Sequence, residues 1–538
     1  MRLGVVAVVV SLFVPALHAQ KKPTPKPPFI EPAEHRHARA LMRAAARKPN
    51  VTGEWTTLPV VMGINPVHVA LMHNGKVLVI AGSGNDEKNK DYWQAAVYDP
   101  VTATQRTFKI SIDRFDMFCN GMVVLADGRP FVFGGTSKYS NNPWEPWIGE
   151  NKTAVFDPST ETFTDTAPMS LGRWYPTGTV LADGKVLVIS GLGNGGRNPS
   201  VDIYDPSLNQ WTSAGSDFGD ETPLYPRMTL LRNGKVFDSG SNWRTRMYPP
   251  VKGVWPVVAP TLFGKNREYG SSVLLPLTPS RKFAERVMIL GGGPDDSSKV
   301  ACPPPPARPE MKIKATDTTE IIDLTADTPK WTAGPKMTAP RIQLNATLLP
   351  GGRVLVSGGS RIDECDSTAV KAAELYDPEK NAFSPAETME FPRLYHSNTL
   401  LLPDATVLAV GGNPVRGEYE PHIEIYSPPY LFKSDGKRAA RPAIDPATTS
   451  KITYDASFDI RTSNAGSIRR VDLIRAGAVT HSFDMDQRLI ELEFTRGSGV
   501  LQAKAPATAN LAPPGWYLLF IIDENGVPSN AHWVQLSL

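Results

Sequence analysis

The sequence has few cysteines and few histidines, and it lacks a long apolar run after its first residues. It holds 3 cysteines and 9 histidines among 538 residues. No segment beyond the N-terminus offers the roughly 20 consecutive apolar residues that a membrane-spanning helix needs. Positive and negative charges are interspersed and sum to +3, without the basic patch typical of nucleic-acid binding. We therefore expect no integral membrane segment in the mature chain and no nucleic-acid partner.

The N-terminus has the order of features found in secretory signal peptides. Arg2 precedes an apolar stretch from Gly4 to Leu17, and the small residue Ala19 follows. A membrane anchor is the alternative, although the stretch is short for that purpose. Residues 1–19 are therefore predicted to be a signal peptide, and residues 20–53 a Lys- and Pro-rich tether with a short N-terminal segment. We expect a secreted protein, periplasmic or extracellular.

An odd number of cysteines in an exported chain leaves one of them unpaired or bonded to another molecule. Cys302 and Cys365 both lie in sequence typical of surface loops, where exported proteins commonly carry disulfides. We favour a disulfide between these two, with Cys119 as the unpaired thiol. Taken alone, Cys119 is better explained as a small buried hydrophobic side chain.

Proline and glycine, in contrast, are plentiful and spread along the chain, with 50 and 43 copies. They mark short strands joined by turns rather than long helices. One unit recurs, in which an Asp-Gly or Asn-Gly turn leads through an apolar strand to a glycine-rich end. The copies begin near residues 74, 127, 183, 233, 286, 352 and 405.

A second motif follows most copies and reads apolar-aromatic-Asp-Pro, as in Val97-Tyr98-Asp99-Pro100. The Asn-Gly and Asp-Gly pairs predict two-residue hairpins with positive φ. Consecutive copies are about 50 to 67 residues apart, which is near the kelch period. We therefore predict an all-β fold with a seven-bladed kelch β-propeller over residues 54–432.

The tail, residues 437–538, lacks this repeat. Its strand-like stretches include the alternating Ser457–Ile460 and the continuous apolar run Trp516–Ile522. These features predict a C-terminal immunoglobulin-like β-sandwich domain.

Four local motifs carry possible chemistry, although most kelch propellers are binding modules. They are Cys119, Gly172–Thr177 with Tyr175, Arg393–Ser397 with Tyr395 and His396, and Val479–Arg488 with His481. Imidazole nitrogens and phenolate oxygens would suit Cu(II) if they converged. Copper is a one-electron metal, whereas oxidising an alcohol or aldehyde takes two electrons. A second redox centre is therefore needed, and a tyrosine can supply it as a radical. An unpaired cysteine beside that tyrosine could form a thioether and lower its potential. A lone histidine in such a sequence is otherwise more often structural.

Together, and in this order, the four motifs resemble those of the copper radical oxidases, the family of galactose oxidase and glyoxal oxidase, and are most similar to the glyoxal oxidase branch. The resemblance implies that Cys119 and Tyr175 form a thioether-linked radical cofactor. It implies that Tyr175, Tyr395, His396 and His481 bind one copper ion, with Tyr395 as the axial ligand and base. It also implies that His481 reaches the propeller axis from the last domain.

The same resemblance implies oxidation of small aldehydes, as their hydrates, or of primary alcohols, with dioxygen reduced to hydrogen peroxide. Galactose oxidase carries a tryptophan that stacks on the cross-linked tyrosine, and the matching loop here, Gly191–Gly196, has no aromatic residue. Trp243 on the next blade is a candidate for that place. We expect a monomer, and the sequence leaves the physiological substrate open.

Two other functions remain open at this point. One is a non-catalytic kelch module that binds carbohydrate or cell-wall polymer, with the tyrosines and histidines merely packed. The other is a sialidase-like hydrolase, for which we find no arginine triad with an acid/base carboxylate.

Overall fold

Strands make up nearly all regular structure in the part of the chain that the structure describes. The structure, a computed structural model, describes residues 48–84, 86, 93–110, 115–140, 146–249, 252–295, 299–303, 311–414 and 418–538. The expected signal peptide and most of the expected tether lie outside these residues. Helical structure in the described part is limited to α2 (Pro49–Thr52) and short 3-10 turns. No helix in these ranges is long and apolar enough to cross a membrane. The predicted all-β class is confirmed.

Seven sheets contain the repeat strands; six of them have four antiparallel strands, and the first has two further strands at one edge. The repeat strands of the first sheet are β2 (His68–Leu71), β3 (Val77–Gly82), β4 (Trp93–Asp99) and β5 (Thr104–Ile110); those of the second are β6 (Gly121–Val124), β7 (Pro130–Phe133), β10 (Thr153–Asp157) and β11 (Thr162–Thr166); and those of the third are β12 (Thr177–Val180), β13 (Val186–Ile189), β16 (Ser200–Asp205) and β17 (Gln210–Ser216). The fourth sheet has β18 (Met228–Leu230), β19 (Val236–Asp238), β20 (Arg244–Tyr248) and β21 (Val257–Pro260), and the fifth has β22 (Ser271–Leu274), β23 (Arg286–Leu290), β26 (Thr319–Asp323) and β27 (Trp331–Ala333). The sixth has β28 (Asn345–Leu348), β29 (Val354–Ser357), β30 (Ala372–Asp377) and β31 (Ala382–Thr388), and the seventh has β32 (Asn398–Leu401), β33 (Val407–Val410), β34 (His422–Ser427) and β1 (Glu54–Val61).

Three short strand pairs extend from these sheets. They are β8 (Thr136–Lys138) with β9 (Ile148–Gly149), β14 (Leu192–Gly193) with β15 (Gly196–Arg197), and β24 (Val300–Ala301) with β25 (Met311–Lys312).

The two ends of the repeat region meet in the seventh sheet. Strand β1 pairs with β34, and Glu54 lies opposite Ser427. The first strands of neighbouring sheets also lie side by side: β2 contacts β6 and β32, β12 contacts β6 and β18, and β28 contacts β22 and β32. All four residues of each of β2, β6 and β12 are buried, as expected for strands enclosed on both faces.

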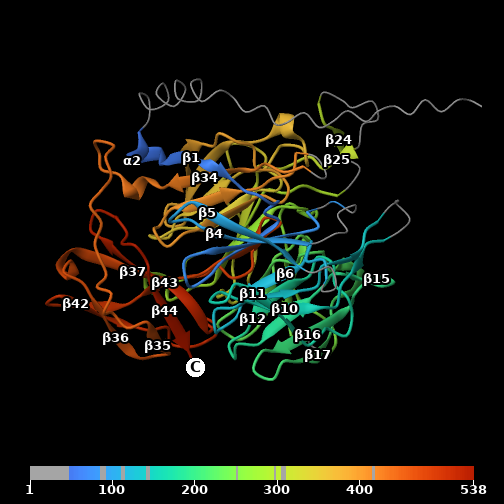
Figure 1. The fold of residues 1–538 in the computed structure, drawn as a ribbon, viewed down its shortest axis with the longest axis horizontal. Coiled ribbons are helices and arrows are strands. Elements are labelled where there is room, and N and C mark those ends of the chain that lie inside the picture. Colours follow the sequence, from blue (N-terminus) through green and yellow to red (C-terminus); the bar gives the residue numbers. More distant parts are fainter. Residues whose placement is uncertain are drawn as a thin grey trace, which may run out of the picture. The chain divides into compact units, whose positions relative to one another are not determined.

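The C-terminal residues form two further sheets, drawn in orange and red in Figure 1. One has the order β35 (Lys451–Thr453), β44 (His532–Ser537), β43 (Gly515–Asp523), β37 (Ile468–Arg475) and β40 (Leu489–Leu492). The other has β36 (Ser457–Arg461), β42 (Val500–Lys504) and β41 (Phe494–Gly497). A hairpin of β38 (Ala478–Thr480) and β39 (Phe483–Asp484) leaves these sheets and adds to the edge of β2.

The turns between first and second strands differ in one respect from the prediction. In the first repeat, Leu71 pairs with Val77, and Met72 donates its N–H to the carbonyl of Lys76. The loop therefore has three residues, of which only Gly75 has positive φ, at 81°. The predicted two-residue hairpin is wrong here, because a type I turn followed by one left-handed glycine closes the strands instead.

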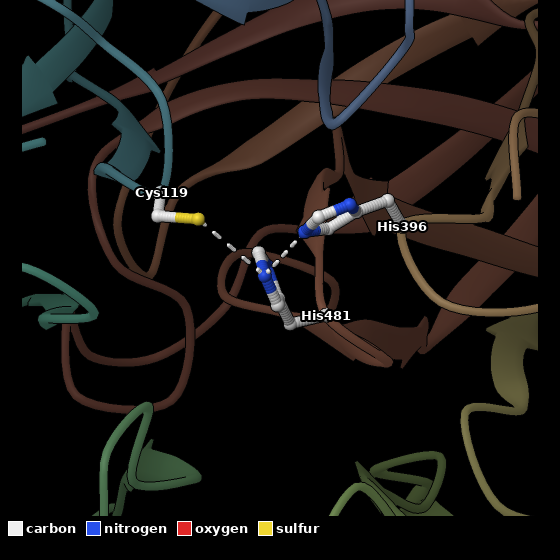
Figure 2. A group of neighbouring side chains, drawn as sticks. All are labelled: Cys119, His396 and His481. Atoms are coloured by element: carbon white, nitrogen blue, oxygen red, sulfur yellow. Dashed lines mark hydrogen bonds between the residues drawn. The ribbon is translucent and has the colours of Figure 1, made fainter. Parts of the chain in front are cut away.

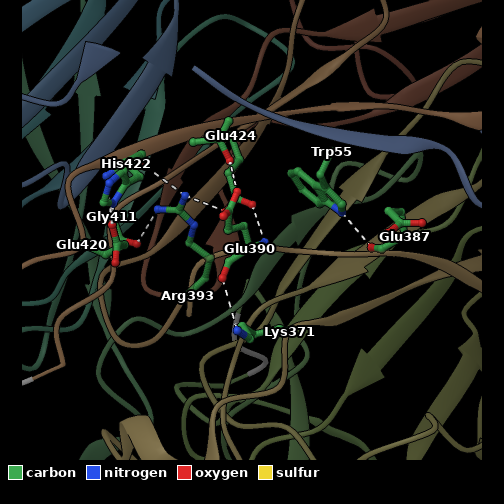
Figure 3. A network of polar contacts seen from close by, with 10 residues as sticks. Trp55, Lys371, Glu387, Glu390, Arg393, Gly411, Glu420, His422 and Glu424 are labelled. Atoms are coloured by element: carbon green, nitrogen blue, oxygen red, sulfur yellow. Dashed lines mark hydrogen bonds and ion pairs between the residues drawn. The ribbon is translucent and has the colours of Figure 1, made fainter. Parts of the chain in front are cut away.

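A clamp built on a buried arginine recurs in four of the sheets. In the seventh, the Arg393 guanidinium lies 2.8 Å from the Glu424 carboxylate on β34 and donates to the carbonyl of Gly411 (Figure 3). The other pairs are Arg173–Asp202, Arg267–Glu320 and Arg341–Glu374, at 2.6, 2.7 and 2.9 Å. Each arginine thus ties the segment before a first strand to the third strand of the same sheet. These Arg–carboxylate clamps fix the corner that leads into the strand.

Candidate metal centre

Six first strands are preceded by a residue in the left-handed backbone conformation. These central residues are Cys119, Tyr175, Tyr225, Tyr269, Gln343 and His396, with φ of 61°, 66°, 46°, 49°, 64° and 63°. Positive φ costs a non-glycine residue about 1–3 kcal/mol and concentrates at functional sites. The shared position follows from the repeat, since each residue stands at the turn that enters a first strand.

Backbone hydrogen bonds join these central residues between sheets. The Tyr175 N–H donates to the carbonyl of Cys119 at 3.1 Å, and the Tyr225 N–H donates to the carbonyl of Tyr175 at 3.0 Å. The Gln343 N–H donates to the carbonyl of Tyr269 at 2.8 Å. Residues far apart in sequence are thereby held next to one another.

His481 comes to this group from the β38–β39 hairpin. It occupies the hairpin tip with Ser482, and both have positive φ, 47° and 68°. The Thr480 hydroxyl donates to the carbonyl of Val67 at 3.0 Å, and the Ser271 hydroxyl donates to the carbonyl of Ser482 at 2.7 Å. The tip is therefore held by the first and the fifth sheets together.

The Asp-Gln-Arg run after His481 anchors the base of the same hairpin. Asp486 accepts the N–H of Val124 at 2.6 Å and pairs with Arg475 at 3.2 Å. The Gln487 amide donates to the carbonyl of Ala346 and accepts the N–H of Leu348. This motif positions His481 and has no direct contact with the centre among the contacts of the described residues.

The two predicted histidine ligands and Cys119 meet in one buried place (Figure 2). The Nε2 atoms of His396 and His481 are 3.0 Å apart, and Cys119 Sγ lies 3.9 Å from His481 Nε2. The hydroxyls of Tyr175 and Tyr395 are hydrogen-bonded to each other. The Tyr175 and His481 ring centroids are 4.7 Å apart.

Hydrogen bonds on the far side of each imidazole fix its tautomer. His396 Nδ1 lies 2.5 Å from Oδ1 of Asn413, which only accepts. His481 Nδ1 lies 2.6 Å from Oγ1 of Thr480, whose own hydrogen is given to Val67. Both Nδ1 atoms therefore carry the proton, and both Nε2 lone pairs point at each other.

Two facing lone pairs repel each other, and a cation between them would satisfy both. Burial lowers the pKa of His396 to about 3 and the pKa of His481 well below its usual value, so a proton does not fill this role near neutral pH. Two imidazole nitrogens and two phenol oxygens form a donor set that suits Cu(II). Burial raises the pKa of the Cys119 thiol well above its usual value, which disfavours a thiolate ligand. The residues present thus fit one copper ion with nitrogen and oxygen ligands.

A pocket of about 490 Å³ opens beside this centre. Tyr175 and His481 form part of its wall, with Tyr225, Arg227 and Glu268 from the neighbouring sheets. Its mixture of cationic, anionic and hydroxyl groups is suited to a small polar molecule.

The ring that stacks on Tyr175 belongs to Trp174, with centroids 3.7 Å apart and planes 9° apart. Trp243 lines the pocket, but Arg244 stands over its ring at 4.5 Å. Cys302 and Cys365 are joined by a disulfide, and Cys119 is the free, buried cysteine of the described residues.

Several residues around the centre were not predicted from the sequence. Tyr225, whose ring lies 4.5 Å from both Tyr175 and His481, had a usable signal in Tyr225-Pro226, which repeats Tyr175-Pro176. Asn413 and Thr480 had none, because their role depends on how separate segments meet.

Known proteins resemble the chain along most of its length. Residues 81–430 match the model of the glyoxal oxidase N-terminus, and residues 441–536 match the galactose oxidase-like early set domain. Galactose oxidase of Gibberella zeae is 27% identical over 466 residues, which cover 82% of this chain but 64% of that protein's length. An aldehyde oxidase, GLOX, of Vitis pseudoreticulata is 28% identical and is covered over 98% of its length by 90% of this chain.

A solved structure has the same fold. It is a fungal alcohol oxidase of the AA5 family in complex with copper, with a TM-score of 0.76 and 25% identity over 90% of this chain and all of that chain. The chain belongs to the glyoxal oxidase family of oxidoreductases and carries a galactose oxidase-like domain at its C-terminus.

Proposed function

We propose that this protein is a secreted copper radical oxidase. It oxidises small aldehydes, as their hydrates, or primary alcohols, and reduces dioxygen to hydrogen peroxide. The observation that carries the proposal is the approach of His396 Nε2 and His481 Nε2 to 3.0 Å beside the hydroxyls of Tyr175 and Tyr395. The family and the copper-bound alcohol oxidase of the same fold support it.

We assign the copper ligands as Tyr175, Tyr395, His396 and His481. When bound, copper supplies one-electron redox chemistry and so accounts for half of a two-electron oxidation. Tyr175 accounts for the other half as a ring radical, and the thioether that we propose between its ring and Cys119 lowers the potential of that radical. Burial of both residues in one apolar cluster with Phe118 and Trp174 keeps water away from the ring.

Tyr395 has the role of base. Its phenol oxygen receives the hydroxyl proton of the substrate, and Tyr175 takes the hydrogen atom from the adjacent carbon. Burial raises the pKa of Tyr395 well above its usual value, so the free side chain is protonated, and a bound copper ion would have to stabilise the phenolate that serves as the base. The substrate enters through the pocket lined by Tyr225, Arg227 and Glu268.

We further infer that the seven sheets are the blades of a kelch propeller over residues 54–432. The pairing of β1 with β34 and the contacts among first strands support closure of such a ring. Residues 437–538 then form the immunoglobulin-like domain that supplies His481. Residues 1–19 remain the proposed signal peptide, and the protein is proposed to act as a monomer.

Copper loading followed by intact-mass and peroxide measurements tests this function. Protein loaded with copper in air should lose the mass of two hydrogens, and reduction of disulfides should not restore it. Peroxide should form with an aldehyde or primary alcohol and fail to form in Cys119→Ser and His481→Ala. A folded, copper-loaded protein with full linear mass and no peroxide would instead support the kelch binding module.

A further inference from the structure

A column of four aromatic rings leads away from the candidate metal centre. We define this aromatic column as Tyr175, Trp174, Trp147 and Tyr139. Successive centroids are 3.7, 4.6 and 4.6 Å apart, and the first two ring pairs are stacked with planes 9° and 10° apart. The rings are thus in van der Waals contact over the whole column.

The column passes from the interior to the surface. Tyr175 and Trp174 are 6% and 7% exposed, whereas Trp147 and Tyr139 are both partly exposed. Tyr139 directly follows β8, and Trp147 directly precedes β9, so the outer two rings belong to one strand pair. This strand pair brings oxidisable side chains from solvent to the buried ring.

A glycine makes the close approach of that strand pair possible. A Cβ atom on Gly149 in β9 would lie 2.1 Å from the backbone nitrogen of Trp174. The Arg173 N–H also donates to the carbonyl of Glu150, the next residue, at 2.9 Å. The backbone of β9 is therefore seated directly on the segment that carries Trp174 and Tyr175.

We propose that the aromatic column conducts oxidising equivalents inward from the surface to Tyr175. This inference rests on the proposed function, since it requires a redox-active Tyr175. Tryptophan and tyrosine are the side chains that give up one electron most readily, and rings in contact exchange electrons by short steps. The cross-linked ring of Tyr175 has the lowest potential in the column, so an oxidising equivalent placed at Tyr139 or Trp147 moves toward it.

Each step of the proposed transfer moves one electron outward from a ring to its outer neighbour. A one-electron oxidant at the surface gains an electron from Trp147 or Tyr139, and each oxidised ring is refilled by its inner neighbour. Tyr175, which as a metal ligand is already a phenolate, loses one electron and no proton. The column thus lets an oxidant too bulky for the pocket restore the radical form of the protein.

Laser flash-quench measurements on the copper-loaded, cross-linked protein test this route. Tris(bipyridine)ruthenium(III), a bulky one-electron oxidant, is generated by the flash, and transient absorption with freeze-quench EPR follows oxidation of Tyr175. Trp147→Phe should slow this oxidation roughly tenfold or more, because phenylalanine keeps the packing but loses the oxidisable indole. Tyr139→Phe should also slow the oxidation of Tyr175, and it replaces Trp147→Phe as the test variant if Trp147→Phe does not fold.

Trp516→Phe is the matched control, because Trp516 is a partly exposed tryptophan that stacks on His73 and lies outside both the aromatic column and the pocket. It should leave the rate of Tyr175 oxidation unchanged. Equal rates in wild type, Trp147→Phe and Tyr139→Phe would overturn the proposal while leaving the oxidase function intact. A wild-type protein in which no Tyr175 radical forms would overturn the proposed function together with this inference.

Discussion

At the scale of single residues, the centre depends on two side chains that touch no substrate. Asn413 and Thr480 hold the protons of His396 and His481 on Nδ1 and so direct both Nε2 atoms inward. Partners of this kind orient histidine ligands and contribute to metal affinity. In the proposed site, affinity for copper should therefore depend partly on residues outside the ligands.

Replacement of Asn413 separates this role from general packing. Asn413→Ala removes the acceptor from His396 Nδ1 and should weaken copper binding by about 10–100-fold. Asn413→Asp keeps an acceptor at the same place and should retain tight binding. Copper dissociation constants from competition titration report both. An equal loss of copper affinity in the two variants would show that Asn413 acts through its packing and not through its acceptor oxygen.

A buried carboxyl makes stability depend on pH. Burial raises the pKa of Asp116 to about 7, although its Oδ1 accepts the N–H groups of Ser83 and Phe118. Since this folded pKa exceeds the unfolded one, near 4, the native state binds more protons between these values. The contribution of this carboxyl to stability is then greatest below about pH 4 and is lost as the pH rises to about 7.

Asp116→Asn should flatten that part of the profile. The amide oxygen still accepts both N–H groups but does not ionise, so the free energy of unfolding should lose a pH-dependent part of at most about 3–4 kcal/mol. Melting temperatures measured from pH 4 to 7.5 provide the comparison. An unchanged slope would assign the pH dependence to other groups, such as Asp238.

At the scale of elements, the Arg–carboxylate clamps connect repeat geometry to the metal centre. Arg393 and Arg173 stand two residues before Tyr395 and Tyr175, whereas Arg341 has the same place before Gln343, which is no predicted ligand. Glu424 and Glu374 also match each other closely, since both are buried and each accepts one further backbone N–H. The Arg341–Glu374 clamp is therefore a matched control for the Arg393–Glu424 clamp.

Glu424→Gln and Glu374→Gln should cost similar stability but affect copper differently. Each leaves a buried guanidinium without its carboxylate, which typically costs about 3–5 kcal/mol. Only Glu424→Gln releases the corner that carries Tyr395 and His396, so only this variant should shift the copper absorption spectrum and lower copper affinity. Calorimetry and titration measure the two effects. Equal spectral changes in both variants would contradict a local role.

The sequence predicted these elements where its signals were local. Asp-Gly turns and glycine pairs are local patterns that reflect backbone conformation. They located all seven pairs of first and second strands, including the weak copy at Arg286. The ring that stacks on Tyr175 was not predicted, because the family pattern points to the loop Gly191–Gly196, whereas the ring comes from the adjacent residue Trp174. Likewise, the pairing of β38 with β2 joins residues about 400 positions apart, which no local pattern encodes.

At the scale of the whole molecule, the centre unites distant parts of the chain. His481 comes from the C-terminal residues and His396 from the seventh sheet, while the hairpin that bears His481 is paired with the first. Their packing is continuous as well, since Leu518 and Phe520 share an apolar cluster with Val69 and Leu400. Unfolding of any of these parts must therefore disperse the ligands.

Copper should consequently raise the melting temperature of the whole protein. A ligand that binds only the native state stabilises it by about 2.7 kcal/mol at a free concentration of 100 times its dissociation constant. Differential scanning calorimetry should show one transition that moves upward with free copper in the wild type. His481→Ala removes a ligand supplied by the C-terminal part and should abolish most of this shift. If the variant instead showed the full wild-type shift, copper would be binding elsewhere, and the centre joining the sheets to the C-terminal hairpin would lose its support.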